Sequence, residues 1–299
     1  MTERVCSHSF DMLGKTSNPT RFHPVAKLRI QVTAIEAAFS LVLAKPSKKS
    51  VHELRTTTRR MEAQLDLLAL LARSEPALHI PPKLDAWLRK QLAKLRKEAG
   101  KVRDLDVQRE LFSEAAHSKK NKDAHAEAKK LRHDLKAERD KEADALLKLI
   151  QQHSLKLSPR LEKMIESLAA AEAFSLSPTQ WAELTRAWFA THIAGADISG
   201  VDTEGLHTIR KMAKVARYIA ESCDGSKTSA TGRLAARFET LQEAGGTWHD
   251  LLTVRELAGK RLGKSADLEA YFAHREKKAL AVFRHKLSAE TTSELSQES

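Results

Sequence analysis

The sequence predicts an all-α protein, and three observations support this fold class. The chain has 299 residues, with 11 glycines and 8 prolines to interrupt regular structure. Its composition is shifted toward Ala, Leu, Glu, Lys and Arg, which favour helices. Apolar residues recur at helical spacing, whereas the alternation of Val, Ile and Thr that is typical of strands is nearly absent.

The first half of the chain, about 24–152, follows a polar segment at 1–23 that is expected to form a loose tail. A helix begins after Pro24 and ends at the break KPSKKS. Ser50 is the expected N-cap of the next helix, because a serine hydroxyl there can accept a hydrogen bond from the first turn. The first two helices are therefore separated by a short loop.

Three further helices are expected in this half. Pro81 and Pro82 suit the start of the third, and Gly100 suits its end. A shorter helix follows from about 102 to 116. The segment 121–150 is predicted to be one long helix with eight Lys or Arg and seven Asp or Glu, so its charges nearly cancel and indicate a solvated face.

The second half, about 159–288, repeats this order of helices, and residues 289–299 are expected to form a polar tail. His52 corresponds to His207 at an offset of 155 residues, and VRDLD corresponds to WHDLL at an offset of 146. Two similar offsets indicate an internal duplication. The predicted helices are 159–171, 178–194, 203–222, 229–244, 248–263 and 266–288.

Two helices of the duplicated unit carry basic residues on one side and apolar residues on the other. In VHELRTTTRR and in LHTIRKMAKVARY, the basic groups stand at helical spacing with few acids to neutralise them. Like charges at this spacing repel one another, so the pattern favours an anionic ligand over a solvated surface. The residues are His52, Arg55, Arg59, Arg60, His207, Arg210, Lys211, Lys214 and Arg217.

The third predicted helix adds more positive charge. Residues 83–103 contain eight Lys or Arg and two acids. Four of these lysines form a stripe along one side, and Arg233 and Arg237 hold a comparable place in the second half. Asp104 and Asp250 each follow a basic residue or a histidine, where they can cap a helix or orient a neighbouring Arg or His. The lysines of the stripe are Lys90, Lys94, Lys97 and Lys101.

The composition favours some partners and argues against others. There are 51 Lys and Arg against 39 Asp and Glu, a net charge of +12, which favours polyanions. The two cysteines and the absence of an apolar leader or membrane span predict a soluble, cytoplasmic protein with no membrane partner. The sequence has no glycine-rich phosphate loop and no metal-binding histidine motif, so we expect no metal and no cofactor.

Four blocks of the sequence together resemble the conserved histidine α-helical domain, or CHAD, family. They are VHELRTTTRRM, AGKVRDLDV, LHTIRKMAKVARYIAE and LQEAGGTWHDLLTV, and the resemblance spans about residues 25–285. It implies two helical bundles related by a pseudo-twofold axis, with long charged helices. The chain lacks the Glu-x-Glu-x-Lys motif of the hydrolase domain that accompanies some members, so it resembles a stand-alone member.

The resemblance also implies a ligand and a site. Members in bacteria and archaea bind inorganic polyphosphate in a central basic channel, which here would be lined by His52, Arg55, Arg59, Arg60, His207, Arg210, Lys214 and Arg217, with Arg103 and the basic helix faces close by. Glu62 stands where the family often has a basic residue. His249, which belongs to the expected site, stands where an Asn is common.

These considerations predict a protein that binds inorganic polyphosphate and is not an enzyme. Polyphosphate granules and their associated proteins are the further partners that this function suggests. Two alternatives stay open: an enzyme that processes polyphosphate or a phosphate ester, and a helical protein that binds nucleic acid. Nucleic acid is the less favoured partner, because the few aromatic residues are not interleaved with the basic ones.

Overall fold

The computed structural model describes residues 21–118, 122, 124–193, 202–223, 226–263 and 266–295. This part of the chain is built from α-helices, and the β pairing found in it is one isolated bridge between Phe22 and Leu176. The all-α prediction is confirmed. The helices are α1 (Pro24–Ala44), α2 (Lys48–Leu71), α3 (Pro82–Ala116), α4 (Ala124–Ser167), the short 3-10 helix η1 (Ala169–Ala171), α5 (Pro178–Ile193), α6 (Thr203–Glu221), α7 (Ala230–Leu262) and α8 (Asp267–Leu295).

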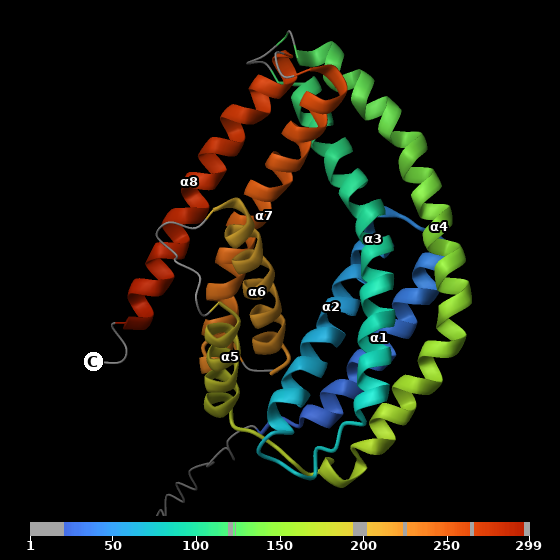
Figure 1. Cartoon of the computed structure of the whole chain (residues 1–299), viewed down its shortest axis with the longest axis vertical. Helices are drawn as coiled ribbons and strands as arrows, with labels where there is room; N and C mark the ends of the chain where they lie inside the picture. Colours follow the sequence, from blue (N-terminus) through green and yellow to red (C-terminus); the bar gives the residue numbers. More distant parts are fainter. Residues whose placement is uncertain are drawn as a thin grey trace, which may run out of the picture.

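The helices form two lobes of four, which lie side by side in Figure 1. In the first lobe α1 packs against α2 and α4, and α3 packs against α2 and α4. In the second lobe α6 packs against α5 and α7, and α7 packs against α8. The lobes touch through α2 and α6, through α3 and α7, and through α4 and α8. Each contact joins a helix to the fourth one after it, an arrangement that two copies of one unit would produce.

At one end of the molecule the lobes share an apolar cluster, which we call the distal junction. It combines buried residues of α3 and α4 with buried residues of α7 and α8. The rings of Phe112 and Phe272 meet edge to face at 5.6 Å between centroids, and both are fully buried. Aromatic pairs of this geometry contribute beyond their buried area. The distal junction therefore fixes the spacing between α3–α4 and α7–α8.

At the other end the lobes meet at the proximal junction. Phe22, just before α1, packs edge to face on Trp181 of α5, and its backbone forms the bridge with Leu176. Arg60 of α2 pairs with Glu221 of α6 at 3.3 Å. The sequence placed Phe22 in the loose tail, but its side chain is buried; residues 1–20 of that segment lie outside the described residues.

Several predicted helix boundaries are wrong in the same way. α3 continues through Gly100, and α7 continues through Gly245 and Gly246, where the sequence suggested that each helix ended and another began. Glycine weakens a helix by about 1 kcal/mol relative to alanine, and packing against neighbouring helices outweighs that. Asp104 and Asp250 are consequently inside helices, and the interpretation of these residues as N-caps is wrong.

The boundaries of α2, α4 and α8 also differ from the prediction. Ser47 is the N-cap of α2, because its Oγ accepts from the Ser50 backbone N–H at 3.1 Å. Ser50 instead donates its hydroxyl to the Lys45 carbonyl at 2.5 Å. α4 runs past Pro159 to Ser167 and follows a long curve along the first lobe (Figure 1). α8 runs on to residue 295, through part of the predicted C-terminal tail. None of the helices in the described residues is long and apolar enough to span a membrane.

Candidate functional site: a basic cleft between the lobes

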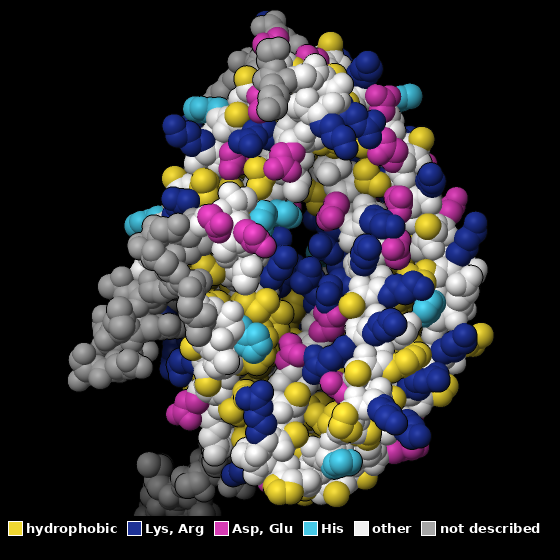
Figure 2. Space-filling model, in the orientation of Figure 1, with side chains coloured by type: hydrophobic (Ala, Val, Ile, Leu, Met, Phe, Trp, Pro, Cys, Tyr) yellow, Lys and Arg dark blue, Asp and Glu magenta, His cyan; other side chains and the backbone are white. Residues whose placement is uncertain are grey.

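Figure 2 shows a hollow between the two lobes with Lys and Arg side chains gathered around it. It is flanked by the distal and proximal junctions, and α2, α3, α6 and α7 line it. We call it the basic cleft and define it by its interacting charged groups. These are Arg55 and Arg59 from α2, Arg96, Arg103 and Asp104 from α3, Arg210 and Lys214 from α6, and His249 and Asp250 from α7.

The contribution of α2 follows from its amphipathic pattern. Val51, Leu54 and Met61 are fully buried in the first lobe. Arg55 and Arg59 lie on the other side of the helix, one turn apart, and face the second lobe. The Arg55 guanidinium lies 3.9 Å from the Asp104 carboxylate of α3. His52, one turn earlier, is exposed at the rim.

The helix α6 makes a matching contribution from the second lobe. Leu206, Ile209 and Ala213 are buried. Arg210 and Lys214, one turn apart on the opposite side, face Arg55 and Arg59 across the cleft, and the four charges interact. The two helices that the sequence singled out as copies of one motif therefore meet with their basic sides together.

The helix α3 adds Arg96 and Arg103, which are two turns apart and therefore on one side. Sequence reasoning missed Arg96, because the nearby lysine stripe drew attention to a different side of the same helix. The Arg96 guanidinium pairs with the Glu62 carboxylate of α2. Glu62, a departure from the family pattern, thus partly neutralises a cation at the wall of the cleft.

The helix α7 contributes the acid Asp250 and two rings, those of Trp248 and His249, which contact His207 of α6. The His207 ring lies on Trp248 and meets the His249 ring edge to face, each at 4.8 Å between centroids. Trp248 is buried and its indole N–H donates to the Glu276 carboxylate at 2.9 Å. The tryptophan is therefore fixed, and it holds His207 against α7.

Two glycines inside helices lie where an arginine of a neighbouring helix passes close to the backbone. Gly100 faces Arg55, and Gly245 faces Arg210. A Cβ at Gly100 of α3 would lie 3.8 Å from the Arg55 Nε. A Cβ at Gly245 of α7 would lie 3.0 Å from the Arg210 Cγ and 2.9 Å from the Phe283 ring. Gly245 therefore leaves room that no other residue would leave, and the arrangement is matched in the two lobes.

This contrast predicts opposite effects for one substitution at the two positions. Gly100→Ala adds an ordinary contact and a better helix former, so the free energy of unfolding should rise by up to about 1 kcal/mol. Gly245→Ala presses on the buried Phe283 ring, so the free energy of unfolding should fall by about 1–3 kcal/mol. Denaturant unfolding of both variants measures the difference. A loss of stability at both positions would contradict the packing described for Gly100.

Several side-chain nitrogen atoms in and beside the cleft are buried without a hydrogen-bond partner among the described residues. Buried donors are rarely left unpaired, because removing them from water without a partner costs about 1–3 kcal/mol each. Donors on both lobes are in this condition, so an acceptor placed between the lobes would reach them together. The atoms are Arg55 Nε, Arg59 Nε, Arg103 Nη1, His207 Nδ1, Arg210 Nε and His249 Nδ1.

Burial and mutual repulsion shift the proton affinities of the inner groups. Burial, and to a smaller extent the charges of Arg55 and Arg96, lowers the pKa of Arg59 to about 10. Burial, followed by Arg59 and Arg55, lowers the pKa of Lys214 to about 7. Burial, followed by Arg210 and His207, lowers the pKa of His249 to about 3, so this ring is neutral at pH 7. The cleft therefore lacks negative charge relative to its cations.

The carboxylates of Asp104 and Asp250 do not remove this deficit. Each faces several guanidinium groups, Arg55 and Arg103 among them. Burial raises the pKa of Asp250, an effect that outweighs the nearby arginines. These two acids leave most of the positive charge of the six cleft cations unneutralised.

Other predicted site residues lie at the ends of the cleft or away from it. Arg60 and Arg217 both pair with Glu221 at the proximal junction. In the lysine stripe of α3, Lys94 contacts His153 and Lys101 pairs with Glu142, both on α4. Arg233 donates to the Thr228 carbonyl near the start of α7. Lys90, Lys97 and Lys211 are exposed, and Arg237 is partly buried.

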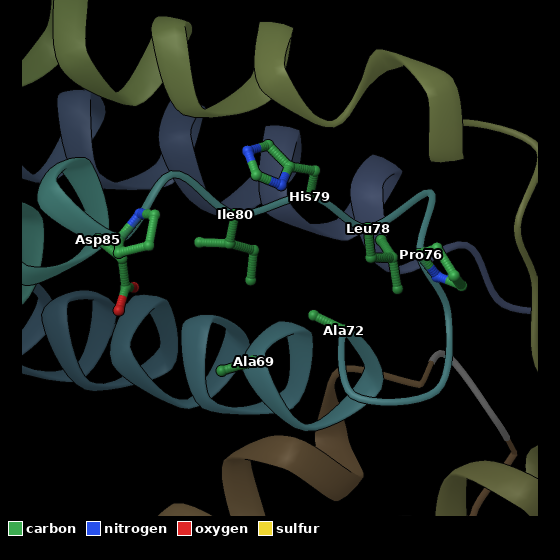
Figure 3. A pocket seen from close by; sticks show the side chains of 8 residues that line it. Ala69, Ala72, Pro76, Leu78, His79, Ile80 and Asp85 are labelled. Atoms are coloured by element: carbon green, nitrogen blue, oxygen red, sulfur yellow. The ribbon is translucent and has the colours of Figure 1, made fainter.

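Another depression of the surface has different chemistry. Figure 3 shows it between the end of α2 and the loop before α3, lined by Ala69, Ala72, Leu78 and Ile80 with His79 and Asp85. Its lining lacks a concentration of like charge, so it does not match the pattern that marks the basic cleft. No group of three or more potential metal-ligating side chains occurs within the described residues.

Comparison with known proteins gives the following similarities. A family model described as "CHAD domain" matches residues 26–259. A solved structure, PptA from Streptomyces chartreusis, aligns with a TM-score of 0.64 at 16% identity, covering 89% of this chain and 98% of that chain. The CHAD domain from the plant Ricinus communis aligns with a TM-score of 0.58 at 18% identity, covering 91% and 94%. No curated protein matches the sequence.

Proposed function

The chain belongs to the CHAD domain family, and from this premise we propose that it binds inorganic polyphosphate in the basic cleft without altering it chemically. The observation that carries the proposal is the set of buried arginine donors on both lobes that have no acceptor among the described residues. A phosphate chain supplies both the acceptor oxygens and the negative charge that these groups lack.

The geometry of the cleft suits a chain better than a single phosphate ion. Its cations come from α2 and α3 of the first lobe and from α6 of the second, so they are distributed along a path. Arginine can donate two hydrogen bonds to the oxygens of one phosphate, whereas lysine acts as a point charge. A polymer with about one charge per phosphate would neutralise several cations together and release its counterions.

Titration with polyphosphates of graded length tests this proposal. We expect affinity to rise steeply from orthophosphate to long chains, because only long chains span both lobes. The logarithm of affinity should fall with the logarithm of salt concentration by roughly 0.7–0.9 per phosphate neutralised. Equal affinity for orthophosphate and long chains, or a flat salt response, would overturn the proposal.

The proton affinity of Lys214 predicts a dependence of binding on pH. A bound polyanion favours the charged amine, so it raises the lowered pKa of this group. Below pH 7 Lys214 is already protonated, and the affinity should not change through this residue. Above pH 7 binding requires uptake of a proton, so affinity should fall by up to about tenfold per pH unit.

Lys214→Arg provides the control for this prediction, because arginine keeps its charge throughout the range. Affinities measured from pH 6 to pH 9 at constant ionic strength should decline for the unmodified protein and stay nearly level for the variant. A level profile for the unmodified protein above pH 7 would contradict the role given to Lys214.

Two competing functions have direct tests. Incubation with labelled polyphosphate and Mg²⁺ distinguishes a binding protein from an enzyme, because an enzyme would shorten the chains or release phosphate. Competition by RNA or DNA at equal phosphate concentration distinguishes the polyphosphate site from a nucleic-acid site.

We further propose that the protein is cytoplasmic and associates with polyphosphate granules. Co-sedimentation of the protein with isolated granules would test this association.

A further inference from the structure

A second group of basic side chains lines a depression of ≈ 460 Å³ between α3 and α4. It shares no lining residue with the basic cleft. Every described side chain that lines it is a lysine, an arginine or a histidine. They are Arg109 and His117 of α3 and Lys129, Arg132, His133 and Lys136 of α4. We call this feature the α3–α4 pocket.

The pattern of α4 explains why its cations gather there. Lys129, Arg132 and Lys136 follow one another at spacings of three and four residues, so they share one side of the helix. Leu131 and Leu135, on the opposite side, are buried in the distal junction. Packing of the apolar side thus fixes which way the basic side faces.

Acids on α3 near the pocket are engaged with other helices. Glu110, next to Arg109, pairs with Lys48 of α2 at 2.5 Å. Glu114 pairs with Arg275 of α8 at 3.3 Å. Neither of these two carboxylates is among the described residues that line the pocket.

Two acids on α4 also interact with groups of the second lobe and not with the cations of the pocket. Glu127 accepts a backbone hydrogen bond from the first turn of α8 at 3.0 Å, and Glu138 pairs with Arg261 at 2.7 Å. Asp134 lies 3.6 Å from the His133 ring. The charges of α4 nearly cancel in sequence, but in space two of its acids turn to the second lobe while several cations turn to the pocket. The interpretation of the whole helix as a solvated, balanced face is therefore incomplete.

Arg109 provides an independent observation. Its Nε is buried and has no hydrogen-bond acceptor among the described residues. The same condition marks Arg55, Arg59, Arg103 and Arg210 of the basic cleft. We propose that the α3–α4 pocket is a second anion site that binds an oligophosphate group, with Arg109 as its inner donor and the cations of α4 around it.

The ligand chemistry is a short run of linked phosphates, because several cations within one small pocket match more than one phosphate group. Such a run can belong to a free oligophosphate or to a distant stretch of a chain held in the basic cleft. The inference does not require the proposed function, since the pocket shares no residue with the cleft. Tripolyphosphate supplied to a variant that lacks the cleft cations separates the two sources, because no long chain is then held in the cleft.

Lysine footprinting with an acetylating reagent and mass spectrometry tests the site directly. Saturating tripolyphosphate should slow acetylation of Lys129 and Lys136 by about tenfold relative to chloride at equal ionic strength, since bound phosphate shields a contacting amine. Lys130 and Lys141, exposed on the same helix and outside the pocket, should react unchanged. Equal rates for the two pairs with and without tripolyphosphate would overturn the proposal.

Two variants extend the test. Arg55→Gln/Arg59→Gln/Arg210→Gln removes cleft charge and should leave the protection of Lys129 and Lys136 intact. Arg109→Gln/Arg132→Gln removes pocket charge and should reduce that protection at least about fivefold. If the cleft variant retains full affinity for long polyphosphate but pocket protection persists, the proposed function fails and the second site stands. Loss of pocket protection in the cleft variant, with normal circular dichroism, would overturn the second site as an independent one.

Discussion

Removing the four inner cations of the basic cleft together is expected to weaken polyphosphate binding by about 10³-fold or more. Each charge-assisted hydrogen bond to phosphate contributes about 1 kcal/mol or more, and the contacts act on one ligand. Helicity should stay nearly unchanged, because these side chains do not fill either apolar core. Binding titrations and circular dichroism measure the two effects. The substitutions are Arg55→Gln, Arg59→Gln, Arg210→Gln and Lys214→Gln.

A matched control removes the same amount of charge from the outside of α4. The lysines chosen are exposed, and they lie outside both the basic cleft and the α3–α4 pocket. If binding depended only on a diffuse positive surface, the cleft variant and the control variant would lose the same amount of affinity. We expect the control to lose less than about tenfold in affinity, through long-range attraction that salt screens. Equal losses would mean that the cleft is not the binding site. The control substitutions are Lys130→Gln, Lys141→Gln, Lys148→Gln and Lys163→Gln.

Replacing Arg59 by methionine is expected to stabilise the unliganded protein while it weakens binding. Arg59 is largely buried among other cations, and its Nε has no acceptor among the described residues. Replacing buried charged groups with apolar groups of similar size often raises the free energy of unfolding by about 1–4 kcal/mol. Methionine keeps the length of the side chain and removes the repulsion with Arg55 and Arg96. Thermal unfolding without ligand should therefore shift several degrees upward.

In the same experiment with polyphosphate, the stabilisation added by the ligand should be smaller for Arg59→Met than for the unmodified protein. A ligand that binds only the folded state adds about 4 kcal/mol at a thousand times its dissociation constant. The unmodified protein should therefore gain more from polyphosphate than Arg59→Met does. Arg186→Met, at a partly buried arginine of α5 away from the cleft, serves as the control and should change neither quantity in this way. If Arg59→Met lowered the stability of the unliganded protein, the repulsive cluster described here would be wrong.

The fold could be predicted largely from local patterns. The apolar spacing of α2 and α6 determined which sides are buried, and the repeated blocks predicted that their basic sides are alike. Helix ends were predicted less well. Gly100 and Gly245 resemble stop signals in sequence, whereas each is a point where a side chain from another helix crosses closely. That contact joins residues distant in sequence, and local reasoning does not detect it.

The site residues were likewise predicted where local spacing determines them and missed where the packing of helices does. Arg55, Arg59, Arg210 and Lys214 were predicted from helical spacing, and the structure brings them together. Arg96 was missed because α3 is basic on more than one side, and sequence does not reveal which side faces the cleft. The lysine stripe on another side contacts α4 at Lys94 and Lys101 instead. Whether the stripe also binds polyphosphate remains a prediction.

The two junctions have a consequence for the rates of binding. Because the lobes are held together on both sides of the cleft, the cations keep their spacing before any ligand arrives, and capture does not wait for the lobes to close. Association should then be limited by diffusion and electrostatic attraction, approaching 10⁸–10⁹ M⁻¹s⁻¹ at low salt, roughly the range for steered encounters. Differences among chain lengths and among cleft variants should appear mainly as differences in how long the complex lasts.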